Sequence, residues 1–266
     1  MPSHADTLPR FERDGITLNG IEGGPISFAF TERTGGVSQE PYASLNLGTH
    51  VGDDPFAVEE NRRRVLEAFG CTDCAHNLLV PNQVHGDEVV RVESSGAEYL
   101  VDIRDRIAEG CDAIVCTVPD VPVMLCFADC VPVVLTCPGG FAVVHSGWKG
   151  TYARISAKAA RELVDATGCE ASQIKAYIGP HILGDEYEVL TDLLQKFQER
   201  FSTIEPNGSR MLDLSRAIRQ SLEEVGVLPC EIHDPGLSTV RLGDRFYSYR
   251  REAGTCGRHA AIAVMR

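Results

Sequence analysis

Short hydrophobic runs that end at glycine or polar residues dominate this chain, and this pattern is typical of an α/β protein. The runs between 112 and 144 are apolar almost throughout, which favours strands buried on both faces of a covered sheet. Alternation over 26–30 favours a half-buried strand. The predicted strands are 26–30, 78–84, 88–92, 112–118, 121–127, 131–137, 141–144, 176–178, 247–251 and 260–264, with another around Ile232.

Hydrophobic residues spaced three or four apart predict helices between these strands. The clearest helix has Thr151 as its N-terminal cap and ends at Gly168. The other predicted helices are 55–69, 189–201 and 214–225. No segment of linker composition divides the chain, so we predict one α/β domain with mixed β-sheets and outer helices.

The length of 266 residues allows one or two domains, since a domain takes roughly 100–200 residues. We predict a single domain over 1–266, with residues 1–20 as a loosely packed N-terminal extension. Acidic residues outnumber basic ones by 38 to 25, and the formal charge of −13 argues against binding to nucleic-acid phosphates. A small anionic substrate in a locally positive pocket is still compatible with this charge.

The sequence carries no signal for export or membrane insertion. Residues 1–15 are polar and lack the apolar core of a signal peptide. No apolar run approaches the roughly 20 residues that span a bilayer, so we expect a cytoplasmic protein without membrane partners. The ten cysteines are scattered, several of them in apolar strands, and we expect thiols or metal ligands rather than disulfides.

Three separated segments each supply one metal-binding or nucleophilic side chain, namely His85, Cys130 and His145. Two of these segments lie where an apolar strand runs into a polar turn, so a fold with adjacent strand ends brings the three together. Thiolate and imidazole ligands favour zinc or copper over magnesium or calcium. Two histidines and one cysteine leave a fourth coordination position vacant, which is typical of catalytic rather than structural zinc.

The same residues also fit a Cys–His hydrolase, with Cys130 as nucleophile and His145 as base. Both interpretations need a deprotonated cysteine near an imidazole, so the sequence leaves them open. The helix expected after Gly150 directs N–H groups toward this region, and Lys149 adds positive charge for a phosphate or carboxylate. Asp129 is interpreted either as an acid–base group or as a carboxylate that stabilises its loop.

Other metal motifs are weaker. Cys71 and Cys74 have the spacing of zinc ligands and His76 is close by, but no second pair completes a four-ligand site. A blue-copper centre is disfavoured because no histidine or methionine follows Cys130 closely. The H-x-E and P-C-x-x-C pattern of cytidine-type zinc deaminases is absent from the sequence.

Several motifs along the chain belong together. They are TERTGGVS (31–38), PYASLNLG (41–48), GDD (52–54), QVHG (83–86), DA (112–113), ADCVP (128–132), HSGW (145–148), IGP (178–180), YEV (187–189), SYRR (248–251) and GR (257–258). In this order they resemble the multicopper polyphenol oxidoreductase (laccase-domain) family of YfiH-like proteins. The resemblance covers nearly the whole chain, which excludes chance as its explanation.

This resemblance implies a cytoplasmic, often monomeric enzyme with a YfiH-like α/β fold, related to the CNF-type cysteine-hydrolase toxins. Members phosphorolyse adenosine, inosine, guanosine and methylthioadenosine, and they deaminate adenosine. By resemblance, His85, Cys130 and His145 are metal-binding and catalytic, with zinc as the expected metal and copper as the alternative. Purine nucleosides and inorganic phosphate are then the expected partners.

Further roles are assigned from the resemblance and from position in the chain. Arg33 and Lys149 are expected to bind phosphate, and Asn46 is expected to hydrogen-bond the purine or ribose. In deamination, Asp129 is expected to carry the proton while a metal activates water. Family members commonly have Ala and Arg where this chain has Ser146 and Lys149, and lysine lacks the planar fork of arginine.

Three other functions stay open from the sequence. One is a copper oxidoreductase acting on phenols, which needs bound copper and oxygen. Another is a metal-independent hydrolase that uses Cys130 to edit a peptidoglycan precursor. The third is a non-catalytic, zinc-stabilised binding module. A requirement for phosphate separates the phosphorylase from all three.

Overall fold

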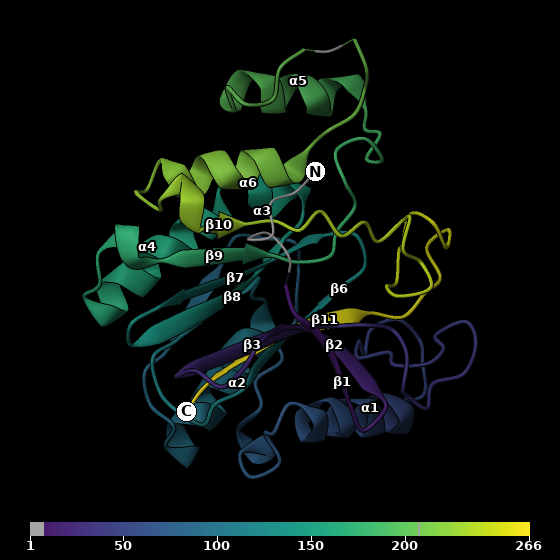
Figure 1. The fold of residues 1–266 in the computed structure, drawn as a ribbon, viewed down its shortest axis with the longest axis vertical. Helices are drawn as coiled ribbons and strands as arrows, with labels where there is room; N and C mark the ends of the chain where they lie inside the picture. Colours follow the sequence, from purple (N-terminus) through teal and green to yellow (C-terminus); the bar gives the residue numbers. More distant parts are fainter. Residues whose placement is uncertain (1–7, 207) are drawn as a thin grey trace.

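The computed structural model describes residues 8–206 and 208–266, which form two β-sheets flanked by helices (Figure 1). The antiparallel five-stranded sheet has the order β1 (Arg10–Arg13), β2 (Ile16–Ile21), β3 (Ile26–Thr31), β11 (His259–Met265) and β6 (Val123–Phe127). The mixed six-stranded sheet has the order β10 (Ile232–His233), β9 (Lys175–Ile178), β7 (Val131–Cys137), β8 (Gly140–Ser146), β5 (Ala113–Cys116) and β4 (Val89–Val92).

Helices cover the outer faces of both sheets. In Figure 1, α3, α4 and α6 lie on one side of the six-stranded sheet, and α1 lies beyond the five-stranded sheet. The bounds are α1 (Pro55–Ala68), α2 (Ala97–Glu109), α3 (Trp148–Tyr152), α4 (Ile155–Thr167), α5 (Thr191–Arg200) and α6 (Leu214–Glu223). Short 3-10 helices occur at Ala75–Asn77, Ala171–Gln173 and Pro229–Glu231.

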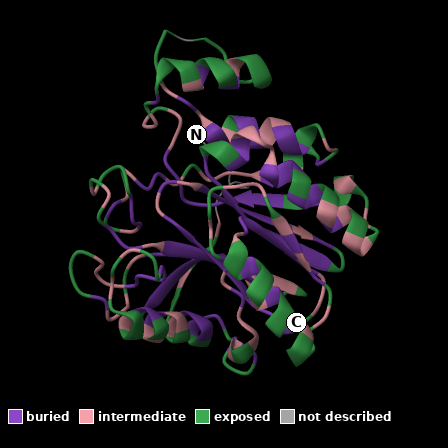
Figure 2. Ribbon diagram, turned by 180° about the vertical axis from the view of Figure 1, so that it is seen from behind, coloured by how far each residue is buried: buried purple, intermediate pink, exposed green. Residues whose placement is uncertain are grey.

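Three hydrophobic clusters fill the spaces between these layers, and Figure 2 shows the central strands buried along most of their length. The first cluster joins the six-stranded sheet to α4, α5 and α6. The second lies between the two sheets and includes residues of α2. The third joins the outer face of the five-stranded sheet to α1. Strands covered on both faces explain the apolar runs between 112 and 144.

The predicted α/β fold class is confirmed, with mixed sheets and outer helices in one domain. Most predicted elements are present with small shifts at their ends. These are β3, β4, β5, β6, β7, β8, β9, β10 and β11, together with α1, α4, α5 and α6.

Two predicted strands are wrong. Residues 247–251 form a turn, because the Ser248 hydroxyl accepts the Arg251 N–H at 3.1 Å and the Ser248 carbonyl accepts the Glu252 N–H at 2.9 Å. Residues 78–84 pair with a strand only at Leu79, which bridges to β6. Pro81 lacks a backbone donor and interrupts any longer ladder there.

Three further differences concern helices and the N-terminal segment. The helix predicted from Thr151 is divided into α3 and α4 at Arg154, whose φ of 63° is left-handed. Helix α2 was not predicted, although its buried residues have helical spacing. The predicted loose packing of 1–20 is wrong for β2, because Ile16 and Leu18 are fully buried. Residues 1–7 lie outside the described part.

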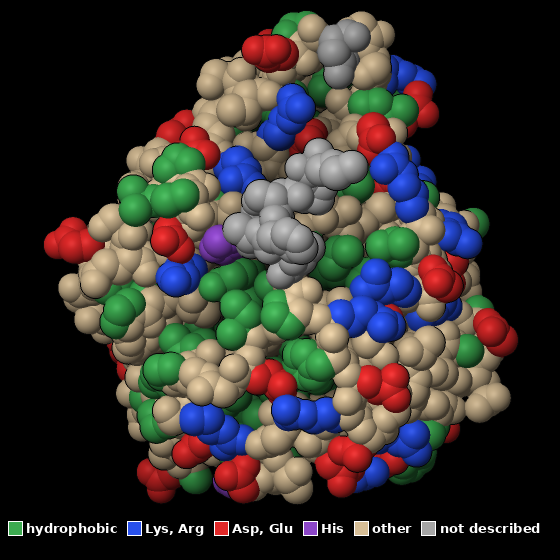
Figure 3. All heavy atoms as spheres, viewed as in Figure 1, with side chains coloured by type: hydrophobic (Ala, Val, Ile, Leu, Met, Phe, Trp, Pro, Cys, Tyr) green, Lys and Arg blue, Asp and Glu red, His purple; other side chains and the backbone are tan. Residues whose placement is uncertain are grey.

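The outer surface mixes acidic and basic side chains over most of the face in Figure 3. Hydrophobic side chains gather near the centre of this view, where Figure 1 draws β3. A largely apolar hollow of about 580 Å³ lies there, lined by Ile26, Phe28 and Tyr177 among others. Among the helices of the described residues, none combines the length and the apolarity needed to cross a membrane.

Candidate metal centre and active site

The ends of four strands of the six-stranded sheet meet at one edge. The chain crosses from the five-stranded sheet to this sheet between β6 and β7, and the crossing carries Cys130. Pro132 in β7 pairs with His145 in β8, so the end of β8 lies beside Cys130. The His145 N–H donates to the carbonyl of Asp112, directly before β5, at 2.7 Å. Strands β4 and β5 are parallel, so the turn before β4 reaches the same edge.

The structure brings His85, Cys130 and His145 together at this edge. Their potential ligand atoms all lie within 4.8 Å of one another. The two imidazole rings meet edge to face, with centroids 4.8 Å apart. His145 is buried, Cys130 is half-buried and His85 is exposed, so the cluster is accessible from the side of His85. We call these three residues the trio.

The buried carboxylate of Asp112 holds both histidines of the trio in place. Its Oδ1 lies 2.7 Å from Nδ1 of His145 and accepts the backbone N–H of His85 at 3.0 Å. Its Oδ2 accepts the N–H groups of Val84 and Gly86 at 3.2 and 2.7 Å. These bonds support the left-handed backbone of His85, whose φ is 58°. Because Nδ1 of His145 is engaged, Nε2 is the ring nitrogen left for a ligand.

The charges of the trio and Asp112 depend on one another. Burial raises the pKa of the Cys130 thiol, but the charges and hydrogen bonds of His145 and His85 lower it overall. Burial lowers the pKa of His145, whereas Cys130 and Asp112 raise it by more. Burial also raises the pKa of Asp112, and the hydrogen bond and charge of His145 reverse this. The site therefore favours a thiolate, the form of cysteine that binds metals and acts as a nucleophile.

The residues present fit a zinc ion. Gly147 lies against the trio, and a Cβ there would be 3.2 Å from Cys130 Sγ, 3.2 Å from His85 Cδ2 and 3.8 Å from His145 Cε1. The absence of a side chain at Gly147 keeps this space open. The Asp112–His145 pair has the arrangement by which carboxylates orient metal-binding histidines. Two imidazoles and one thiolate suit zinc, and copper is the alternative.

The trio lies in the wall of a cavity of about 510 Å³, a size suited to a small-molecule ligand. Arg250 and Arg258 line it. Within the described residues their guanidinium groups donate to backbone carbonyls and, for Arg258, to the Cys256 sulfur, and neither pairs with a carboxylate. They therefore keep their charge available to an anion. The other lining residues are His50, Gln83, Cys126, Phe127, Ala128, Asp129, Ile182, Tyr187 and Tyr249.

Asp129 lines the cavity, but both of its carboxylate oxygens have partners. Oδ1 accepts the Thr239 hydroxyl and Oδ2 accepts the Arg250 N–H, each at 2.6 Å. Asp129 has a left-handed backbone, with a φ of 85°, in the sharp turn by which the chain crosses between the sheets. These contacts tie the crossing to the segment that carries Arg250, which agrees with the loop-stabilising interpretation.

The phosphate role predicted for Arg33 is not supported by its position. Arg33 does not line the cavity, and its guanidinium donates to Glu252 and to the carbonyls of Ala43 and Gly243. It also lies 4.2 Å from the centre of the Tyr247 ring. Because its guanidinium N–H groups are already hydrogen-bonded, Arg33 connects loops of the protein rather than contacting the cavity.

Asn46 and Lys149, the other predicted substrate-binding residues, also lie outside the lining of the cavity. Asn46 is fully buried, and its Oδ1 accepts the N–H groups of Gly48 and Arg258 at 3.1 and 2.8 Å. It therefore acts on the cavity through the backbone of Arg258. Lys149 is exposed on α3, with its Nζ 5.7 Å from the centre of the Trp148 ring.

Sequence reasoning missed Asp112, Arg250 and Arg258 as site residues. Each lies in a motif of the family resemblance, at 112–113, 248–251 and 257–258. Those motifs were the sequence signal that could have identified these three residues, but their residue types alone do not indicate a position near the trio. Their roles come from strand register and from a turn at 247–251 that had been predicted as a strand.

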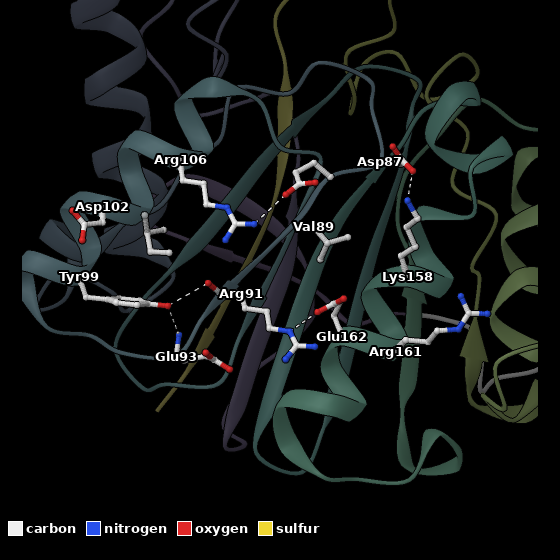
Figure 4. A pocket seen from close by; sticks show the side chains of 12 residues that line it. Asp87, Val89, Arg91, Glu93, Tyr99, Asp102, Arg106, Lys158, Arg161 and Glu162 are labelled. Atoms are coloured by element: carbon white, nitrogen blue, oxygen red, sulfur yellow. Dashed lines mark hydrogen bonds and ion pairs between the residues drawn. The ribbon is translucent and has the colours of Figure 1, made fainter.

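A second, larger groove of about 740 Å³ is lined by charged residues of β4, α2 and α4 (Figure 4). Figure 4 shows three ion pairs across it, Arg106 with Glu88, Arg91 with Glu162, and Lys158 with Asp87. These three cations have carboxylate partners, and the remaining lining cation, Arg161, shares the groove with the acidic Glu93 and Asp102. The groove therefore offers an anion less free charge than the smaller cavity does.

Together the fold and the cavity define a mixed α/β protein with an enzyme-like His–Cys–His centre. Residues 27–266 match the model of a family described as multi-copper polyphenol oxidoreductase laccase, and the chain belongs to this family. The predicted resemblance is thereby confirmed. The relation to CNF-type toxins stays a prediction.

Relatives of this chain are named purine nucleoside phosphorylases. One from Deinococcus radiodurans is 38% identical over 242 residues, covering 89% of this chain and 88% of that protein. Another, PA4543 from Pseudomonas aeruginosa, is 36% identical over 245 residues, covering 89% and 92%.

Solved structures show the same fold. The hypothetical protein YfiH of Bacillus licheniformis has a TM-score of 0.84 at 28% identity, covering 96% of this chain and 98% of that chain. YlmD from Geobacillus stearothermophilus has a TM-score of 0.84 at 29% identity, covering 98% and 99%.

Proposed function

We propose that this chain is a purine nucleoside phosphorylase that cleaves adenosine, inosine, guanosine and methylthioadenosine with inorganic phosphate. The observation that carries this proposal is the placement of the trio in a cavity with the side chains of Arg250 and Arg258 and two tyrosine rings. Guanidinium groups without carboxylate partners suit an oxyanion, and aromatic rings suit a purine. The names of the relatives support the same reaction.

The reaction requires two substrates to be held in one orientation. An oxygen of hydrogen phosphate forms a bond to C1′ of the ribose while the bond from C1′ to the purine nitrogen breaks. The electron pair of that bond goes to the purine, and the proton of hydrogen phosphate ends on the released base. The protein must hold phosphate against the sugar and stabilise the charge that develops on the base.

The chain contributes binding and orientation to this reaction. The trio would hold zinc, or copper as the alternative, which supplies Lewis-acid chemistry at the substrate. Asp112 keeps His145 and the backbone of His85 oriented before substrate arrives. We assign Asp129 to holding Arg250 in the wall rather than to carrying a proton, since both its oxygens are engaged.

Adenosine deamination at the trio is a second activity that we propose. The accessible side of His85 leaves room for a ligand beside the donor set. An open position at a histidine–cysteine zinc centre is the feature by which such centres activate water.

A hydrolase with Cys130 as nucleophile is the alternative function favoured by a specific observation. The thiol pKa is lowered and His145 is hydrogen-bonded to Asp112, so the three have the order of nucleophile, base and orienting carboxylate. This alternative needs no metal and no phosphate, which makes it separable by experiment.

The test is to incubate the purified protein, with its metal content measured, with adenosine in the presence and absence of phosphate, and to separate the products by chromatography. Adenine and ribose 1-phosphate that form only with phosphate support the phosphorylase. Inosine indicates deamination. Cys130→Ala should abolish either activity, whereas Cys230→Ala, at an exposed cysteine outside the cavity, should retain it.

The absence of all these products at high enzyme concentration would overturn the purine assignment. Oxygen-dependent turnover of phenols by copper-loaded protein would support the oxidoreductase instead. Activity on peptidoglycan precursors that survives metal removal and is lost on alkylation of Cys130 would support the hydrolase.

A further inference from the structure

The main cavity continues into a smaller hollow of about 240 Å³. The two share His50, Gln83 and Cys126 as lining residues. Elsewhere, the main cavity shares Tyr187 and Arg250 with a third hollow. This third hollow has no lining residue in common with the hollow of about 240 Å³. The site therefore has two distinct ends, which we call the histidine end, at His50, and the tyrosine end, at Tyr187 and Tyr249.

One loop connects His50, the guanidinium of Arg62 and the backbone of Arg258 at the histidine end. Arg62 donates from Nε and Nη2 to the carbonyl of Leu47, at 3.0 and 2.7 Å. The N–H of Leu47 donates in turn to the carbonyl of Arg258 at 3.0 Å. A Cβ at Gly48 would lie 2.7 Å from Cγ of Arg258 and 3.4 Å from Cε1 of His50. Gly48 therefore lets Arg258 and His50 approach each other.

This end of the site is electropositive in an acidic protein. Among the described residues, the side chains of His50, Arg62 and Arg258 form no ion pair with a carboxylate, although the chain has 38 acidic residues. Loss of hydration lowers the pKa of His50, and the nearby charges of Arg258, His85, His145 and Arg62 lower it further. His50 is therefore uncharged at neutral pH and offers a ring N–H, while Arg62 and Arg258 carry the positive charge. Two guanidinium groups without a counter-charge favour binding of an anion.

We propose that the histidine end is the phosphate subsite, formed by His50 and Arg62 with Arg258 at its border with the main cavity, and that the purine base binds at the tyrosine end. This assignment rests on the proposed function. It replaces Arg33 and Lys149 as the phosphate-binding residues.

The chemistry of displacement requires this division. Phosphate oxygen must approach C1′ from the side opposite to the departing purine, so the two binding regions must flank the ribose. The ribose then lies beside the trio, between the two ends. A hollow of about 240 Å³ is small for a nucleoside but sufficient for an oxyanion, whereas the main cavity has the size of a ligand site.

The tyrosine end suits a planar base. Tyr249 is 56% exposed. The guanidinium of Arg258 lies 5.9 Å from its ring centre, so Arg258 separates this end from the histidine end. The guanidinium of Arg250 lies 5.3 Å from the ring centre of Tyr187. Flat aromatic and guanidinium surfaces stack on purines, and Ile182 adds apolar contact.

The test compares His50→Gln, Arg62→Gln and Tyr249→Leu with the wild type. The histidine-end variants should raise the KM for phosphate about tenfold, because Arg62→Gln removes a positive charge and His50→Gln replaces the ring N–H by a flexible amide. Both should leave the KM for nucleoside within about twofold. Tyr249→Leu should raise the KM for nucleoside and leave that for phosphate unchanged. Arg104→Gln is the matched control, since Arg104 also donates to a backbone carbonyl, that of His76, but lies outside the cavity.

A measurement without catalysis makes the subsite testable by itself. Inorganic phosphate is titrated into the metal-loaded protein and followed by phosphorus NMR, with wild type and Arg104→Gln expected to bind and the histidine-end variants to bind about tenfold more weakly. His50→Gln keeps the test valid if Arg62→Gln fails to fold, because His50 is exposed and makes no hydrogen bond within the described residues.

The outcomes separate the two proposals. If the wild type binds phosphate, the histidine-end variants do not, and no phosphorolysis is detected, the subsite is supported and the proposed function is overturned. Phosphorolysis with unchanged phosphate KM in both His50→Gln and Arg62→Gln supports the function and overturns the subsite. If the wild-type protein binds no phosphate, the phosphate subsite is overturned.

Discussion

Asp112 connects the two histidines of the trio through different parts of each residue. It contacts the ring of His145 and accepts N–H groups from the backbone around His85. A carboxylate offers acceptors to all of these donors, whereas an amide offers one oxygen and places its own donor group against the others. Because the pKa of Asp112 is lowered, its contribution to stability is present above about pH 4 and is lost as the pH falls through the lowered value.

We expect Asp112→Asn to lower zinc affinity by about 10- to 100-fold and the free energy of unfolding by about 1–3 kcal/mol. Competitive titration with a chelator measures the first quantity, and urea unfolding the second. Asp185→Asn is the control, because its carboxylate pairs with Arg241 on the exposed surface. Wild-type zinc affinity in Asp112→Asn would show that this carboxylate does not orient the trio.

Cys130 should differ from the other cysteines in its reaction with iodoacetamide. The imidazoles of His145 and His85 overcome the effect of burial and lower the pKa of the thiol to about 6. The thiolate therefore predominates above about pH 6, whereas an ordinary cysteine reaches that state only near pH 8.5. Burial has the opposite result for Cys111 and Cys137, raising their pKa to about 12.

Peptide mapping of the metal-free protein by mass spectrometry gives the rate of alkylation of each cysteine against pH. We expect the rate at Cys130 to be half-maximal near pH 6 and to fall only in more acidic solution. A half-maximal rate near pH 8.5 would show that the neighbouring imidazoles do not stabilise the thiolate. Zinc should protect Cys130 throughout.

At the scale of the elements, the site is built from the ends of strands rather than from their faces. Strands β4, β5, β7 and β8 supply their ends to one edge of the six-stranded sheet, and their hydrogen-bond register sets the spacing of the trio. The segments at these ends follow no strand geometry, so they can adopt the backbone that each ligand requires. Gly147, between β8 and α3, shows how closely they approach.

We expect Gly147→Ala to lower zinc affinity by about tenfold while changing the free energy of unfolding by no more than about 1 kcal/mol. The added Cβ would press on Cys130 and His85, but the φ of −71° at this position is ordinary for alanine. Zinc titration and thermal melting measure the two effects. In Gly24→Ala the new Cβ meets only the Ile26 carbonyl, at 3.6 Å, so this control should match wild type. Equal zinc affinity in both variants would contradict the role of Gly147.

At the scale of the whole molecule, the fold and the trio are largely independent. The three hydrophobic clusters lie between layers of sheets and helices, whereas the trio lies at a sheet edge. A structural zinc centre, by contrast, typically stabilises a small domain that has no sufficient hydrophobic core of its own. We therefore expect the protein to remain folded without metal.

Removal of metal by a chelator should lower the melting temperature by about 5–10 °C. This follows from a stabilisation of about 2.7 kcal/mol at a zinc concentration of about 100 times Kd, and a shift of about 2–4 °C per kcal/mol. Far-UV circular dichroism before and after chelation checks that the secondary structure is retained. Loss of the helical signal at 25 °C would support the zinc-stabilised binding module instead.

Much of the fold follows from local pattern. Apolar runs predicted β5 to β8 because strands covered on both faces admit few polar residues. The same reasoning failed at 247–251, because the Ser248 side chain caps a turn and local sequence does not reveal which hydrogen bonds it makes. It also missed the burial of Ile16 and Leu18, which depends on the helix α1 packed across their sheet.

By itself, the sequence determined the fold class, because hydrophobic periodicity is a local property of the chain. Its ordered motifs determined the family, and the resemblance to that family singled out the trio. Only the tertiary structure decided which charges surround the trio. Arg33 and Asn46 resembled ligand-binding residues but are engaged by loops, whereas Arg250 and Arg258 line the cavity and Asp112 contacts His145. A charged side chain keeps the same chemistry in either place, and only its partners in the folded chain decide whether it is free to bind a ligand.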